Sequence, residues 1–288
     1  MLSQIFSLIF FVLFAFFPIF LWGYGMNMLS RHEWNRERFF YGMIGGGLSV
    51  GVIYFLQDFL EGSLLLRIFA LGVILALLLG FVWIASGRGS PYVKVFLRKI
   101  AFLHAGIFLI LYIILEIGIG FLPDSLTNTL PMVAGISSFL FAASLEESLK
   151  HLSSVGLTAK QFRFSRRDLL IFGFFITLGF VFLENILYLA KVYPLGLGNI
   201  FLTGITRSIF SLLSHLFAAS ICVMMWWKAL SYGVFSFRYI LTFLIGFLLA
   251  SFAHLFFNEL VASGNMIFVV IFSLVAYFSF TQWLVLDE

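Results

Sequence analysis

Residues 144–150 have the sequence SLEESLK, which places Glu146, Glu147 and Lys150 inside an apolar run from Leu130 to about Ser153. A charged side chain near the centre of a bilayer costs about 2.5–3.5 kcal/mol on insertion scales. Two adjacent carboxylates in such a run must therefore be neutralised, paired or bound by a ligand. Lipid offers no such partner, so the partners must come from other segments of the chain.

The composition around this stretch is that of a membrane protein. Of the 288 residues, 62% are hydrophobic and 10% are charged, and the mean hydropathy is +1.10. A soluble domain carries about 25% charged residues. We therefore expect one membrane-embedded domain over residues 1–288, in a multi-pass protein of the cell membrane whose surroundings are the lipid bilayer. The net charge of +4 is explained by the positions of the loops, and no nucleic-acid partner is expected.

The apolar windows predict the number of helices. About 20 apolar residues are needed to cross about 30 Å of hydrocarbon. The expected fold is an all-α polytopic bundle of about nine transmembrane helices. The windows lie at about residues 2–27, 39–57, 64–85, 97–121, 130–153, 168–192, 200–227, 237–260 and 266–284.

The basic residues predict the orientation of this bundle. All Lys and Arg residues except Arg67, Lys191 and Arg207 fall in or beside alternate loops. Because short basic loops favour the cytoplasmic side, the N-terminus is predicted to lie outside and the C-terminus inside.

The first four windows carry few polar groups. In the second window, Gly42/Gly46 and Gly47/Gly51 form two G-x-x-x-G pairs, which favour close packing against another helix. His104 lies near the predicted cytoplasmic start of the fourth window, where we expect its side chain to reach toward the interface.

The windows between residues 130 and 260 differ because each carries polar side chains along one face. Spacings of four pair Glu146 with Lys150, and Glu147 with His151. Since lipid cannot satisfy such groups, we expect the four helices to enclose an internal, hydrated site. The polar positions are Glu146, Glu147, Lys150 and His151, then Glu184 and Asn185, then Arg207, Ser211 and His215, and finally Ser251, His254 and Asn258.

Two glutamates, two histidines and an asparagine suit hydrolysis. A desolvated glutamate can act as a general base toward water while His and Asn polarise a carbonyl. Alternatively, His215, His254 and one glutamate could hold zinc with an open position for water. These residues equally allow a structural ion-pair network or the proton relay of a transporter, so the chemistry alone leaves the alternatives open.

Four motifs in order narrow these alternatives. They are E-E-x-x-K at residues 146–150, F-x-x-x-E-N at 180–185, Arg207 followed eight residues later by His215, and H-x-x-x-N at 254–258. This order resembles the PrsW family of intramembrane proteases, which belongs with the CAAX prenyl endopeptidases and the gamma-secretase scaffold subunit. The resemblance spans residues 146–258 and implies a catalytic core at 130–260, with accessory helices over 1–121 and a ninth helix at 266–284.

The resemblance implies an endopeptidase, of glutamic or metallo type, that hydrolyses peptide bonds of membrane-anchored substrates, typically a single-pass protein such as an anti-sigma factor. It implies that Glu146 is the water-activating base and that Glu147 is its neighbour or a ligand. The implied catalytic set is completed by Glu184, His215, His254 and Asn258. Supporting residues are Lys150, Asn185 and Arg207, and the candidate ligands of a zinc ion are Glu147, Glu184, His215 and His254.

Two rival functions stay open at this point. The gamma-secretase scaffold subunit belongs to the same superfamily without being a protease, so a non-catalytic scaffold that binds a partner is one alternative. A proton-coupled transporter is the other. Transporters commonly show internal repeats, whereas here the charged motifs are confined to the windows between residues 130 and 260.

Overall fold

The structure is a computed structural model that describes residues 2–29, 36–55, 64–86, 91–120, 131–158 and 165–285. Within these ranges the regular structure is entirely helical, which confirms the all-α prediction, and every predicted window falls on helix. The long helices are α1 (Leu2–Leu29), α2 (Arg36–Phe55), α4 (Leu64–Ser86), α5 (Pro91–Gly120), α7 (Pro131–Thr158), α8 (Arg166–Val192), α10 (Leu212–Leu230), α11 (Phe237–Ala262) and α12 (Met266–Val285).

Several basic residues used to predict the orientation lie outside the described residues, namely Arg31, Arg88, Lys160 and Arg163. The orientation of the termini therefore stays a prediction.

Five of the described helical segments are long and apolar enough to cross a membrane. They are Val95–Ile114, Arg166–Leu195, Leu197–Leu230, Phe237–Ala262 and Met266–Leu284. Large apolar side chains such as Phe252, Phe256 and Ile267 are exposed on the outer faces of these segments, where acyl chains would solvate them. The chain is therefore a multi-pass membrane protein.

The predicted helix at 200–227 is in fact built from three pieces. After a short 3-10 turn, η1 (Tyr193–Leu195), the chain forms α9 (Leu197–Ile205), then the π-helical turn η2 (Thr206–Ser211), and then α10. Arg207 lies in this π turn and His215 lies in α10. A π turn contains more residues per turn than an α-helix, but Arg207 and His215 still face the same oxygen of Glu184, as the predicted polar stripe requires.

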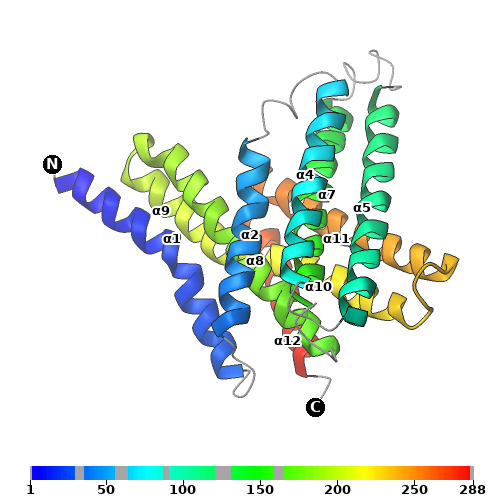
Figure 1. Cartoon of the computed structure of the whole chain (residues 1–288). Coiled ribbons are helices and arrows are strands. Elements are labelled where there is room, and N and C mark those ends of the chain that lie inside the picture. Colours follow the sequence, from blue (N-terminus) through cyan, green and yellow to red (C-terminus); the bar gives the residue numbers. More distant parts are fainter. Residues whose placement is uncertain are drawn as a thin grey trace.

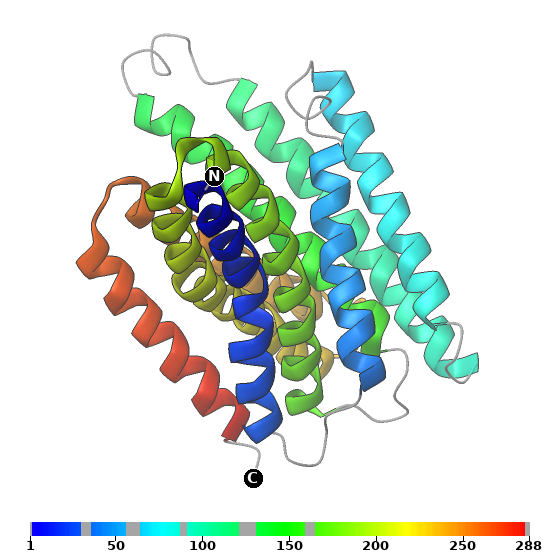
Figure 2. The same cartoon turned by 90° about the vertical axis from the view of Figure 1, so that its left-hand side faces the viewer.

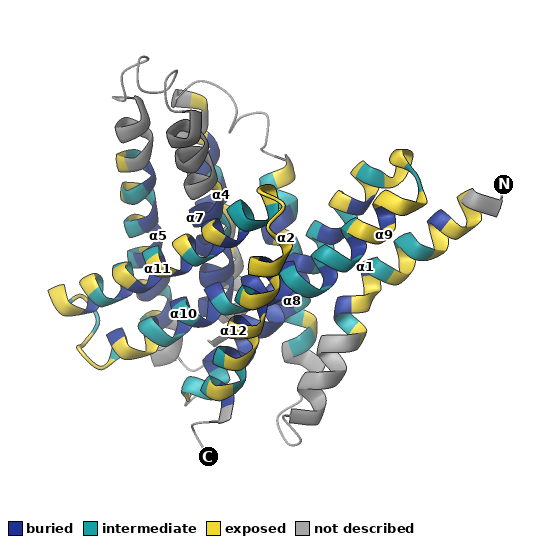
Figure 3. Cartoon of the chain, turned by 180° about the vertical axis from the view of Figure 1, so that it is seen from behind, coloured by how far each residue is buried: buried dark blue, intermediate teal, exposed yellow. Residues whose placement is uncertain are grey.

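α7 is the central helix of the bundle. It packs against α2, α4, α5, α8, α10 and α11, whereas α1 and α12 lie at the periphery (Figures 1 and 2). The burial pattern follows this arrangement, since buried residues gather where α7, α8 and α10 face one another (Figure 3). The SLEESLK stretch therefore lies where several helices can supply partners.

Glycines set the distance between α2 and α8. A Cβ atom on Gly46 would overlap the backbone of Ile176 and Phe180, and one on Gly179 would overlap the backbone of Met43. The first G-x-x-x-G pair thus packs as expected, while Gly47 and Gly51 of the second pair have no described residue within 4 Å of such an atom. The close contact fixes the position of α8, which carries Glu184.

Candidate active site

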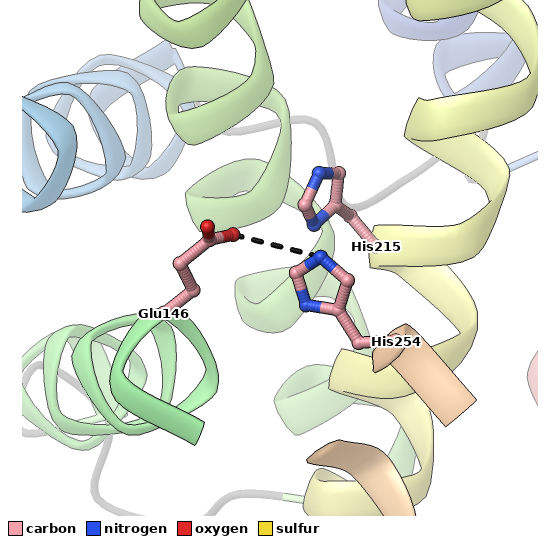
Figure 4. Close-up of side chains that lie close together, drawn as sticks. All are labelled: Glu146, His215 and His254. Carbon is pink, nitrogen blue, oxygen red and sulfur yellow. Dashed lines mark ion pairs between the residues drawn. The ribbon is translucent and has the colours of Figure 1, made fainter. Parts of the chain in front are cut away.

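The site lies where four helices meet. Glu146 comes from α7, Glu184 from α8, His215 from α10 and His254 from α11. His254 Nε2 lies 3.6 Å from Glu146 Oε2, and His215 lies beside this pair (Figure 4). His215 Nε2 lies 3.2 Å from Glu184 Oε2. The two imidazole rings cross nearly at right angles with centroids 4.5 Å apart. The residues that the sequence singled out on four separate helices thus form one cluster.

The two adjacent glutamates of α7 face different surroundings. Successive residues of an α-helix point about 100° apart. Glu146 is 21% exposed and lines a cavity, whereas Glu147 is only 1% exposed. Glu147 Oε1 lies 2.9 Å from His254 Nδ1. Of the two carboxylates, Glu146 is the one that a substrate could reach.

Lys150 makes contacts that differ from those predicted. Its Nζ atom pairs with Glu147 Oε1 at 2.5 Å and lies 2.9 Å from His215 Nδ1. The predicted pair with Glu146 is wrong. Residues three and four apart share a helix face, so Lys150 can reach either glutamate, and it pairs with Glu147, the buried one. The Glu147–Lys150 pair is almost fully removed from solvent, so each charge depends on the other.

A second ion pair joins α8 to the π turn. The guanidinium of Arg207 pairs with Glu184 Oε2, the oxygen that also faces His215 Nε2. The same guanidinium lies over the ring of Tyr188, 4.0 Å from its centroid. The π turn therefore supplies the cation that pairs with Glu184 beside the histidine.

The cluster opens into a cavity of about 410 Å³ between α7, α8, α9, η2 and α11. Its walls combine the polar residues of the site with apolar side chains. The polar lining consists of Glu146, Glu184, Tyr188, Thr203, Thr206, Arg207, Ser211, His254 and Asn258, and the apolar lining of Leu202, Phe257, Val261 and Ala262.

The remaining predicted residues lie in different places. Asn258 lines the cavity one helical turn beyond His254. Asn185 is buried outside the lining, and its side-chain atoms have no hydrogen-bond partner within the described part of the chain. Ser251 donates to the carbonyl of Phe247 in its own helix. Asn258 is thus the predicted asparagine that can meet a substrate.

The cluster fits a metal ion. Glu146, His215 and His254 each offer one ligand atom, and these three atoms lie within 4.8 Å of one another. Glu146 Oε2 is buried and makes no hydrogen bond to any described residue. Two imidazoles and a carboxylate form the donor set of several catalytic zinc sites. The ligand set predicted from sequence contains Glu147, whereas the structure groups Glu146 with the two histidines.

The charges of the site also suit a cation. Apart from the histidines, three carboxylates (Glu146, Glu147 and Glu184) face two cations, Lys150 and Arg207. Glu147 and Glu184 each have a cation as a direct partner, and Glu146 has only His254 in contact at ion-pair distance among the described residues. The unbalanced carboxylate is therefore the one that lines the cavity beside His254.

A second polar network was missed by the sequence reasoning. His104 is fully buried, not at the interface, and its two nitrogens lie 2.8 Å from His151 Nε2 and 2.8 Å from the hydroxyl of Tyr239. His151 Nδ1 lies 3.6 Å from Cys222 Sγ, so the predicted Glu147–His151 pair is also wrong. This network needs the packing of α5 against α7 and α11, for which the sequence carries no local signal.

Comparisons with known proteins give one match. A family model described as "PrsW family intramembrane metalloprotease" matches residues 95–284. This range contains every residue of the cluster. No curated protein matches the chain, and no solved structure does.

Proposed function

The chain belongs to the PrsW family of intramembrane metalloproteases, and from that premise we propose that it hydrolyses a peptide bond of a membrane-anchored protein in the cavity beside Glu146 and His254. One observation carries the proposal. Glu146 Oε2 lies 3.6 Å from His254 Nε2, without a hydrogen bond of its own, at the wall of the cavity. This distance is too long for a direct hydrogen bond, and both atoms can bind the same water or metal ion.

The chain's own residues supply the proton transfers. The Glu146 carboxylate accepts a proton from the attacking water and returns it to the nitrogen of the leaving amine. Asn258 lines the same cavity, and its side-chain amide donates to the carbonyl oxygen as negative charge develops there. Arg207 holds Glu184 in place at the opposite wall. Each group acts from a separate helix, so the site depends on the packing of the bundle.

A metal fits this arrangement at Glu146 and His254, with His215 as the third candidate ligand. When bound, a divalent metal ion such as zinc supplies a Lewis acid for the scissile carbonyl. Glu146 would then hold the ion together with the histidines and would still serve as the base through its carboxylate. We therefore propose a metal-assisted hydrolysis in which Glu146 is the base.

The substrate proposed is a single-pass membrane protein, for which an anti-sigma factor is an example. The cavity is flanked by the last turn of α11, at Val261 and Ala262, and by α9. The distribution of basic residues predicts that these helix ends lie on the outer side. The bond cleaved would then lie toward the outer end of the substrate's transmembrane segment.

The test is co-expression with a panel of tagged single-pass proteins. Wild-type protein should cleave one of them, and Glu146→Gln should abolish the cleavage. Glu259→Gln is the matched control, because Glu259 is on α11 but outside the cavity lining, and it should cleave as wild type does. Cleavage that continues unchanged in Glu146→Gln would refute the proposal, and a partner that co-purifies without being cleaved would favour the scaffold.

A further inference from the structure

The two histidines of the site differ in what their Nδ1 atoms contact. His254 Nδ1 lies 2.9 Å from the carboxylate oxygen Oε1 of Glu147, and His215 Nδ1 lies 2.9 Å from Nζ of Lys150. An ionised carboxylate can only accept hydrogen bonds, whereas an ammonium group can only donate them. The two rings therefore face opposite kinds of partner at the same ring atom.

Lys150 forms a buried ion pair with Glu147. Its Nζ atom lies 2.5 Å from Glu147 Oε1, and the two side chains are 2% and 1% exposed. A carboxylate removed from water in this way needs a cation beside it. Among the described residues, Glu147 lies at ion-pair distance from Lys150 and His254. Lys150 is thus an ammonium donor toward both Glu147 and His215.

The hydrogen bonds then fix the tautomer of each ring. His215 Nδ1 accepts from Lys150, so the neutral ring carries its proton on Nε2, which lies 3.2 Å from the acceptor Glu184 Oε2. His254 Nδ1 carries a proton and donates to Glu147, so its Nε2 atom, 3.6 Å from Glu146, keeps a free lone pair. In this assignment both nitrogens of His215 face a partner, whereas Nε2 of His254 stays available to a ligand.

We infer that the Glu147–Lys150 ion pair of α7 holds the two histidines in opposite tautomers, so that His254 offers a ligand atom and His215 is a hydrogen-bond donor that positions Glu184. Metal-binding histidines generally donate their other N–H to a carboxylate or carbonyl, and His254 has this arrangement while His215 does not. Glu146 and His254 are then the residues that bind the metal, and the catalytic meaning of this assignment rests on the proposed function. Lys150, Glu147 and His215 are then positioning residues.

The direct test is nitrogen NMR of the full chain in lipid bilayers, with ¹⁵N-labelled histidine, after treatment with a chelator and at neutral pH. Signals are assigned by their loss in His215→Gln and His254→Gln. If His215→Gln does not fold, Lys150→Arg, which should shift only the His215 signals of this pair, gives the same assignment. We expect the proton on Nε2 of His215 and on Nδ1 of His254. A proton on Nδ1 in both rings, or on both nitrogens of His215, would overturn the inference.

Variants at Lys150 and zinc measurements complete the test. Lys150→Met should leave His215 as a mixture of tautomers, and Lys150→Arg should restore the single tautomer. Loaded with zinc, His215→Gln should keep the metal content of wild type, and His254→Gln should lose at least tenfold in affinity. Equal loss in both variants would contradict the assignment. Absence of cleavage by the wild type would refute the protease proposal and leave the tautomers, measured without substrate, unaffected.

Discussion

Glu184 Oε2 faces two groups from the same polypeptide stretch, the guanidinium of Arg207 in the π turn and Nε2 of His215 in α10, the latter at 3.2 Å. Two residues eight positions apart in the sequence thus meet at one oxygen atom on another helix. The relationship connects the stability of the bundle to the geometry of the site, because Glu184 also lines the cavity.

Removal of Arg207 should destabilise the fold as well as impair cleavage. Arg207→Gln leaves Glu184 without its cation, and we expect a loss of about 2–3 kcal/mol, below the 3–5 kcal/mol of fully buried pairs because both partners are partly exposed. Thermal unfolding in detergent measures the change. Arg238→Gln, at an exposed position at the start of α11, should leave the unfolding temperature near that of wild type, and equal shifts in the two variants would contradict the prediction.

Adjacent glycines of α2 should respond differently to the same substitution. Gly46→Ala places a methyl group against the backbone of α8 and should cost about 1–3 kcal/mol. Gly47→Ala has no such contact and should be neutral or slightly stabilising, since alanine favours the helix. The unfolding temperatures of the two variants test this difference. A similar loss of stability in both would show that α2 and α8 are not in close contact.

Metal removal should stop cleavage without unfolding the protein. A chelator should abolish cleavage, and zinc should restore it, because the fold is held by helix packing while the ion would bind only side chains at the cavity wall. Metal content and unfolding temperature are measured on the same sample. Undiminished cleavage by a metal-free sample would instead favour a mechanism that uses the carboxylates alone.

The buried histidines of the second network should be structural. His104→Gln disturbs hydrogen bonds to His151 and Tyr239 and the stacking on Phe243, so we expect a loss of about 1–3 kcal/mol. Cleavage per folded molecule should stay near that of wild type, because His104 lies outside the cavity lining. His254→Gln should show the reverse: cleavage per folded molecule is lost. A loss of cleavage in folded His104→Gln would assign the network a part in the reaction.

Sequence alone predicted the helices, and it singled out the polar residues of α7, α8, α10 and α11 that the structure brings together. Apolar windows of about 20 residues predict helices directly, since backbone groups in lipid must be satisfied within the segment. Intramembrane charges are costly, so Glu146, Glu184, Arg207 and His254 were conspicuous in the sequence before their neighbours were known.

Only the tertiary structure decided which of these groups are partners. Helical spacing could not tell whether Lys150 pairs with Glu146 or Glu147, because both lie on its face of α7. The choice follows from which carboxylate is buried against α10 and α11, and His104 likewise acquires its partners from α7 and α11. Sequence thus determined that the charged side chains need partners inside the membrane. The packing of helices far apart in the chain determined which atoms are those partners, because hydrogen bonds and ion pairs depend on distances that no single helix defines.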